Sequence, residues 1–250
     1  SESDMSQRGR LSFINDLDDG FLAQTNGHAQ VEAAIDNYEI AYRMQTAVPE
    51  LVDLAGETEA TKRLYGLESP NASTVAYGRQ CLVARRLIER GVRFVELTMV
   101  GTDGMGQAAN PWDQHTKLEE GHTANALTVD QPVAGLVTDL KSRGLLDETL
   151  VVFSGEFGRT PFVQGTNGRD HNPMGFSLWL AGGGLKKGFI YGQTDEYGYR
   201  VVENAHTVRD LHATVLHLLG LDYTNLTYRF GGRDFRLTDV DGHPIRGILA

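Results

Sequence analysis

The fold expected of this chain is decided by one stretch, Val151–Gly184, which reads VVFSGEFGRTPFVQGTNGRDHNPMGFSLWLAGGG. Two apolar runs, Leu150–Phe153 and Phe176–Leu180, bracket a polar loop within it. Short apolar runs bounded by Gly and Pro are typical of buried strands in a parallel sheet. Because such sheets bind ligands outside the carboxyl ends of their strands, we expect functional side chains in the polar loop.

Helices and strands are expected to alternate around this stretch. A helical pattern over Thr74–Arg90 closes at Gly91, and Val92–Met99 then alternates as in a strand. A second helical pattern, Thr116–Arg143, precedes the apolar run at Leu150–Phe153. This rhythm predicts the α/β class, with a mainly parallel sheet and helices on both faces. The expected central strands are Val92–Met99, Leu150–Ser154 and Phe176–Leu180.

The N-terminal region differs in pattern from the rest. Residues 1–30 are polar and poorly patterned, with room for one short helix at Leu11–Leu17. Val31–Val48 has the apolar spacing of an amphipathic helix, which we expect Pro49 to end. We assign residues 31–250 to a single α/β domain, in which Thr207-x-x-Asp210 has the capping-box signature of a helix start.

Composition excludes several classes of partner. The chain has 250 residues and a formal net charge of −10, which argues against nucleic acid and anionic membranes because both attract basic surfaces. No apolar run reaches the roughly 18 residues of a membrane span. A single cysteine, Cys81, precludes an intrachain disulfide, and its apolar helical surroundings predict a buried thiol.

Acidic residues and histidines gather in two loops that follow expected strands. Glu156, Asp170 and His171 follow the strand at residue 150. The loop after residue 99 adds a further group, which comprises Asp103, Asp113, His115 and His122. Oxygen and imidazole ligands together suit Zn²⁺ or Mn²⁺, and an all-oxygen subset suits Ca²⁺ or Mg²⁺. We therefore expect a divalent metal site at this edge of the sheet.

Each of these residues also has a structural interpretation. Asp113 could cap the following helix, and His115 could be a surface residue of its first turn. Glu156 could pair with Arg159, and the Asp170-His171 pair could stabilise a turn. Their shared placement beyond strand ends favours a functional site, since neither capping nor turns require it.

Two catalytic motifs are missing from the sequence. Ala181–Gly188 reads AGGGLKKG but lacks the spacing of a nucleotide-binding phosphate loop. There is no Gly-x-Ser-x-Gly motif of the serine hydrolases.

Long segments of the chain resemble one known family. The match runs from about Val31 to the C-terminal region and includes YEIAYRMQ (Tyr38–Gln45), CLVARRLIERGVRFVEL (Cys81–Leu97), WDQH (Trp112–His115), GLLDETLVVFSGEFGRTP (Gly144–Pro161), GRDHNP (Gly168–Pro173), WLAGGGLKKG (Trp179–Gly188), YGQTDEYGY (Tyr191–Tyr199), DLHATVLHLLGLD (Asp210–Asp222) and YRFGGRDFRLTDV (Tyr228–Val240). These segments look like the DUF1501 family, a group of sulfatase-like bacterial proteins, abundant in planctomycetes, within the alkaline phosphatase-like superfamily.

The resemblance implies hydrolysis of phosphate or sulfate esters at one or two metal ions. It implies that Asp113 and His115 form the Asp-then-His ligand segment and that His171 is the last histidine of the same site. Glu156 occupies the position where the superfamily usually has Asp-His, and Asp170 is expected to line the site. Arg159 is expected to bind the ester anion through its bidentate donors.

Two departures from the family pattern bear on function. The sequence Glu156-Phe157 lacks the imidazole of the usual pair. The family's N-terminal segment, which carries the nucleophile and the first metal-binding aspartate, has no counterpart here, so we expect the chain to be a C-terminal portion of a longer protein. Family members often begin with a twin-arginine export signal, which implies an extracytoplasmic, periplasmic or secreted location.

Two functions are therefore compatible with the sequence. The first is a metal-dependent hydrolase-like domain, whose partner is a sulfated or phosphorylated small molecule or glycan. The second is a non-catalytic extracytoplasmic binding or surface protein with a degraded metal site, because a fold by itself does not determine function.

Overall fold

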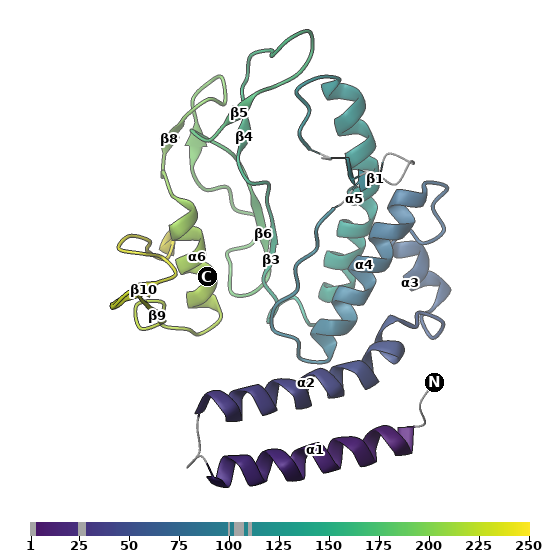
Figure 1. The fold of residues 1–250 in the computed structure, drawn as a ribbon. Helices are drawn as coiled ribbons and strands as arrows, with labels where there is room; N and C mark the ends of the chain where they lie inside the picture. Colours follow the sequence, from purple (N-terminus) through teal and green to yellow (C-terminus); the bar gives the residue numbers. More distant parts are fainter. Residues whose placement is uncertain (1–3, 25–28, 100, 103–107, 110–111) are drawn as a thin grey trace. The chain divides into compact units, whose positions relative to one another are not determined.

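The computed structural model describes residues 4–24, 29–99, 101–102, 108–109 and 112–250 (Figure 1). Asp103, one of the expected acidic site residues, lies outside these ranges. The chain divides into two compact units, Ser1–Gly56 and Glu57–Ala250. No helix in the described part of the chain is both long and apolar enough to cross a membrane.

The first unit is a pair of helices, α1 (Asp4–Gln24) and α2 (Ala29–Val52), which lie side by side (Figure 1). Helix α1 is much longer than the short helix expected at Leu11–Leu17. Pro49 was expected to end the second helix, but α2 continues through it to Val52. A proline inside a helix removes one hydrogen bond, and its ring crowds the preceding turn, but it can still accept a hydrogen bond at its own carbonyl. The next turn still closes, because the Asp53 N–H donates to the Pro49 carbonyl (3.2 Å).

The second unit contains most of the helices and all of the strand pairs in the described residues. Its helices are α3 (Glu59–Leu64), α4 (Ala72–Glu89), α5 (Leu118–Ser142), α6 (Val208–Leu218) and the 3-10 helix η1 (Arg246–Ile248). The capping box predicted for the start of α6 is confirmed, because the Thr207 hydroxyl accepts from the Asp210 N–H and the Asp210 carboxylate accepts from the Thr207 N–H.

The core of the second unit lies between α4 and α5. Side chains of α4 such as Cys81 and Leu82 are fully buried, as is Leu140 of α5. Glycines allow the end of α3 to approach both helices, since a Cβ on Gly78 would collide with the Tyr65 carbonyl and one on Gly135 would lie 2.6 Å from the Leu64 carbonyl. The prediction of a buried thiol at Cys81 is confirmed.

The strands form five separate antiparallel pairs. These are β1 (Gly101–Thr102) with β2 (Ala108–Ala109), β3 (Val151–Phe153) with β6 (Trp179–Ala181), β4 (Gly158–Arg159) with β5 (His171–Asn172), β7 (Gln193–Thr194) with β8 (Val201–Glu203), and β9 (Thr227–Phe230) with β10 (Arg233–Arg236). The structure is 44% helix and only 12% strand. Helices therefore supply most of the regular structure.

The expected parallel α/β sheet of the alkaline phosphatase-like type is wrong. The two runs expected as neighbouring parallel strands pair antiparallel, with Val151 opposite Ala181 and Phe153 opposite Trp179. Residues 92–99, the third expected strand, have no strand partner in the described part of the chain.

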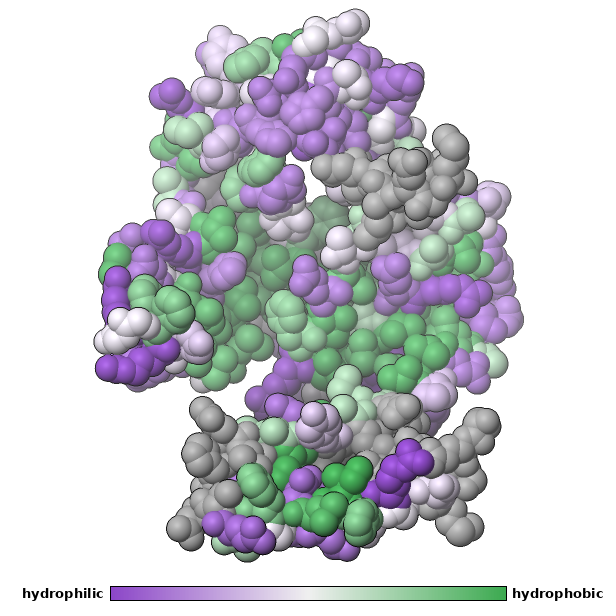
Figure 2. Space-filling model, in the orientation of Figure 1, coloured by the Kyte–Doolittle hydropathy of each residue, from purple (hydrophilic) through white to green (hydrophobic). Residues whose placement is uncertain are grey.

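A parallel neighbour requires a crossover connection, usually a helix. The connection between β3 and β6 instead contains the short β4–β5 pair, so the chain returns antiparallel. Figure 2 shows hydrophobic residues gathered over the middle of this unit, in the region of β3, β6 and α4 in Figure 1. Val152 and Trp179 are both more than a third exposed there.

Candidate metal centre

Two segments far apart in the sequence form the candidate site. The β4–β5 pair places Arg159 directly opposite His171. The segment that precedes α5 carries Asp113 and His115, and backbone hydrogen bonds attach it to the loop before β5. The Arg169 N–H donates to the Gln114 carbonyl (3.0 Å). This attachment brings both segments to one point.

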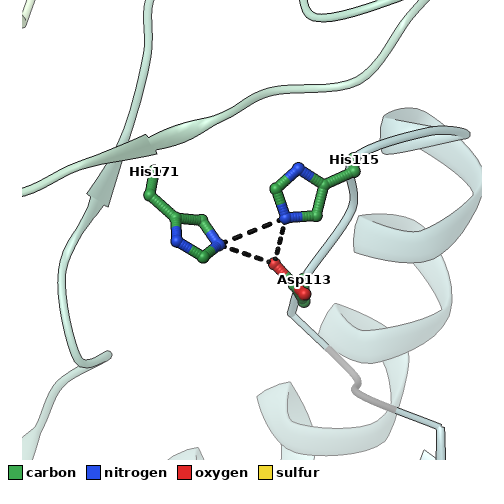
Figure 3. A group of neighbouring side chains, drawn as sticks. All are labelled: Asp113, His115 and His171. Atoms are coloured by element: carbon green, nitrogen blue, oxygen red, sulfur yellow. Dashed lines mark hydrogen bonds and ion pairs between the residues drawn. The ribbon is translucent and has the colours of Figure 1, made fainter.

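Three side-chain atoms converge there (Figure 3). Asp113 Oδ1 lies 2.8 Å from His115 Nε2 and 3.0 Å from His171 Nε2. The two Nε2 atoms are 3.2 Å apart. Zinc bonds of about 2.0–2.1 Å in a tetrahedron place neighbouring ligand atoms about 3.3 Å apart. The observed triangle is slightly smaller than this, so it is close to the face of a tetrahedral site.

Gln164 determines which nitrogen of His115 faces the triangle. Its Oε1 lies 2.5 Å from His115 Nδ1 and can only accept, so Nδ1 carries the proton. A neutral His115 then presents a bare Nε2 to the carboxylate oxygen of Asp113 at 2.8 Å. Two acceptors this close require either a second proton on His115 or a cation between them. A metal-binding histidine is usually held by this kind of second hydrogen bond.

The charge of Asp113 is strongly stabilised. Its pKa is lowered to about 2, chiefly by the hydrogen bond from His171, and also by Arg159 and by the charge of His115, against the opposing effect of desolvation. Arg159 Nη1 lies 2.9 Å from Asp113 Oδ1, and its Nη2 donates to the Trp112 carbonyl (3.0 Å). Asp113 is therefore ionised at neutral pH.

The site is open to solvent on one side. The side chains of Asp113, His115 and His171 are 27%, 38% and 45% exposed. On another side the ring of Phe157 packs against the His171 imidazole, with centroids 4.4 Å apart. All three side chains are therefore partly accessible from solvent.

The structure brings together three of the five expected metal ligands, because the ligand atoms of Asp113, His115 and His171 lie within 4.8 Å of one another. Glu156 is exposed and lies outside this group, and so does Asp170. The Asp170 carboxylate accepts from the His171 N–H (2.8 Å), which is the turn role that the sequence left open.

The remaining alternatives are also resolved by the structure. Asp113 does not cap α5, because the residue before that helix is Lys117 and it makes no side-chain cap. Arg159 forms its ion pair with Asp113. His122 packs edge-on against Trp112, with centroids 5.5 Å apart, and does not join the triad of Asp113, His115 and His171.

Gln164 was missed by the sequence analysis. It lies in a Gly- and Asn-containing loop, where a polar residue is ordinary, and it is 49 residues from the histidine that it contacts. Gly168 makes the contact possible, because a Cβ at this position would collide with the His115 carbonyl. That glycine, within the Asp-His loop, was the only sign in the sequence of a close backbone approach.

Comparison with known proteins gives one result. A family model described as "Protein of unknown function (DUF1501)" matches residues 2–249. No curated protein and no solved structure matches the chain.

Proposed function

This chain belongs to the DUF1501 family, and from that premise we propose that it is a metal-dependent hydrolase-like domain that acts on sulfate or phosphate esters. The observation that carries the proposal is the convergence of Asp113 Oδ1, His115 Nε2 and His171 Nε2 within 2.8–3.2 Å of one another. The sequence resemblance to sulfatase-like proteins supports the choice of ester.

The ligand set favours a borderline metal. One carboxylate oxygen and two imidazole nitrogens suit Zn²⁺ or Mn²⁺ better than Ca²⁺ or Mg²⁺, which prefer oxygen ligands alone. Three protein ligands with an open fourth position are typical of catalytic rather than structural zinc. Such an ion, when bound, would neutralise the ester oxygens and the charge that develops on the leaving group.

The neighbouring side chains prepare the site for an anion. Gln164 keeps the proton of His115 on Nδ1, so that Nε2 is free to act as a ligand. Arg159 holds a fixed positive charge beside Asp113, where a sulfate or phosphate group would bind. A guanidinium offers planar paired donors that match the oxygens of these anions.

Three finer assignments rest on the sequence resemblance alone. They are membership of the sulfatase-like enzymes in the alkaline phosphatase-like superfamily, derivation from a longer protein, and an extracytoplasmic location. The antiparallel strand pairs give no support to the first. The proposed chemistry depends on the triad and does not require the superfamily fold.

A second candidate is a non-catalytic protein that binds one metal ion. It is favoured by the position of Glu156 and Asp170 outside the triad, which leaves a single group of three ligands in the described residues. Such a protein would bind the metal but would not turn over an ester.

Metal analysis combined with activity assays tests both candidates. The full-length protein is stripped with a chelator, titrated with Zn²⁺, Mn²⁺ and Ca²⁺, and assayed on p-nitrophenyl sulfate and p-nitrophenyl phosphate. We expect one equivalent of Zn²⁺ or Mn²⁺ and hydrolysis that depends on it. His171→Ala should lose both, whereas His217→Ala, at an exposed position of α6, should retain both.

The outcomes separate the candidates. Full metal content in His171→Ala, or no bound metal in the wild type, would show that the assignment of a metal site to the triad is wrong. Metal binding that depends on His171 but is accompanied by no hydrolysis of either ester would favour the non-catalytic candidate.

A further inference from the structure

An aromatic pocket adjoins the β4–β5 pair, which carries His171 of the candidate metal centre. It has a volume of about 280 Å³ and is lined by Pro161, Phe162, Asp195, Tyr197 and Tyr199. Its walls come from the chain that follows β4 and from the loop between β7 and β8. No residue of this pocket takes part in the triad.

The pocket and the triad are built on the same hairpin. Pro161 follows Arg159 by two residues, a length of chain that spans at most about 7 Å. Asn172, the neighbour of His171 in β5, is fully buried and donates from Nδ2 to the Tyr199 carbonyl (2.8 Å). The hydrogen bond from Asn172 therefore holds one wall of the pocket to the strand that carries a triad histidine.

The same wall, formed by the loop between β7 and β8, is held in place by Asp195. Its carboxylate accepts hydrogen bonds from the backbone N–H groups of Tyr197 (3.2 Å), Tyr199 (2.7 Å) and Arg200 (3.2 Å). These bonds order the loop and occupy much of the carboxylate's hydrogen-bonding capacity. The aromatic rings are thus presented by a loop with a defined conformation.

The electrostatics of the pocket disfavour a cationic guest. The guanidinium of Arg200 already lies over the ring of Tyr199, with its Cζ 5.7 Å from the ring centroid. The Asp195 carboxylate, which could attract a cation, is engaged by three N–H donors. An uncharged guest with an apolar face fits this environment better than a quaternary ammonium group.

The size and the exposed rings indicate what kind of molecule fits. Tyr197 is 71% exposed and Phe162 is 59% exposed, so both offer ring surface to a ligand. A volume of 280 Å³ is at the small end of ligand pockets, which usually run from about 300 to 1,000 Å³. One sugar ring, whose C–H face is apolar and whose edge carries hydroxyls, meets both requirements.

We propose that this pocket binds a sugar ring of the substrate, so that the ester hydrolysed at the triad is carried by a glycan. The inference rests on the proposed function for the ester chemistry, but sugar binding itself requires neither metal nor hydrolysis. Tyr197 and Phe162 supply the stacking surface, and the hydrogen bonds of Asp195 set the position of Tyr197.

The test uses the methyl glycosides of glucose, galactose and N-acetylglucosamine, with tetramethylammonium as the cationic comparison. Binding to the full chain is titrated by saturation-transfer NMR. We expect at least one glycoside to bind with a Kd of about 1 mM, and Tyr197→Ala to weaken it by about tenfold or more. Tyr228→Ala is the matched control, since Tyr228 is 72% exposed in β9 and lies outside the pocket.

A third variant separates this inference from the proposed function. His171→Ala should keep the affinity for the neutral glycoside while it loses metal. If the protein binds no metal and hydrolyses no ester but still binds sugar through Tyr197, the proposed hydrolase function is wrong and the sugar-binding site stands. The pocket proposal is overturned if no glycoside binds, if Tyr197→Ala binds as the wild type does, or if only tetramethylammonium binds.

Discussion

Arg85 and Asp113 each lie at the centre of a cluster of charged side chains, and the two clusters differ in how they pair positive with negative groups. Arg85 is 3% exposed between α4 and α5, and its guanidinium contacts Glu57 (2.7 Å), Glu89 (2.6 Å) and Asp139 (3.0 Å). Arg143 bridges Asp139 and Glu89 from the other side (2.7 and 2.9 Å). Each of these contacts joins a cation to an anion.

The triad lacks this matching. Its three atoms include two imidazole nitrogens 3.2 Å apart, and the Nε2 of His115 lies 2.8 Å from a carboxylate oxygen. The Arg85 cluster satisfies its own charges around a guanidinium that is 3% exposed, so its role is structural. The triad satisfies its members only when a proton or a cation joins it, and it is open to solvent. Complementary charge therefore distinguishes a structural cluster from a candidate binding site better than the number of charged residues does.

The largest expected effect is on the buried cluster. Arg85→Met leaves Glu57, Glu89 and Asp139 with too little positive charge in a buried setting, so we expect a loss of about 3–5 kcal/mol in the free energy of unfolding. Urea denaturation measures this. Arg209→Met is the control, since its pair with Asp241 is exposed and should contribute no more than about 1 kcal/mol. Equal effects of the two substitutions would contradict the structural role of Arg85.

Alkaline pH should also weaken the core. Burial raises the pKa of Cys81 and of Tyr77 to about 12, and it raises the pKa of Tyr65 together with the nearby charge of Asp139. These groups lose protons more readily when unfolded, so their stabilisation is complete below about pH 9 and declines as the pH approaches 12.

We expect a loss of about 2 kcal/mol by pH 10, measured by urea denaturation at pH 7, 9 and 10. Cys81→Ala should show a shallower decline between pH 9 and 10 because the thiol titrates first. Constant stability of the wild type over this range would contradict the burial of these groups.

Gln164→Leu sharpens the comparison at the triad. Loss of the acceptor lets His115 adopt the other tautomer, so we expect metal affinity to fall by about 10–100-fold. Isothermal titration with Zn²⁺ measures it, and Gln164→Glu should restore most of the affinity because its carboxylate accepts the same hydrogen bond. Gln193→Leu, at an exposed position of β7, is the matched control and should bind as the wild type does. Unchanged affinity in Gln164→Leu would mean that another group orients the ring.

The smallest effect is expected at Glu156. Because the carboxylate of Glu156 lies outside the triad, Glu156→Gln should change Zn²⁺ affinity by less than about threefold. This change is far below the loss expected for Gln164→Leu, since Gln164 orients a ligand ring. The same titration tests it. A loss of Zn²⁺ affinity as large as that of His171→Ala would show that Glu156 is a metal ligand after all.

Local features of the sequence predicted local structure well. The capping box at Thr207 and Asp210 and the buried face around Cys81 were both found as predicted. Each depends on residues within a few positions of one another, where the spacing of polar and apolar side chains determines the hydrogen bonds and the buried face. Asp113 and His115, two residues apart, were likewise recognisable as a pair.

The direction of the strands and the partners of the triad were decided only by tertiary structure. An apolar run such as Val151–Phe153 has the same pattern whether its neighbour is parallel or antiparallel, because alternation records burial and not chain direction. The sequence named Asp113, His115 and His171 as ligands of one site, but it also placed Glu156 there and missed Gln164. Long-range backbone contacts determine which loops meet, such as the close approach of Gly168 to His115. They place Gln164 in contact with His115 and leave Glu156 outside the triad.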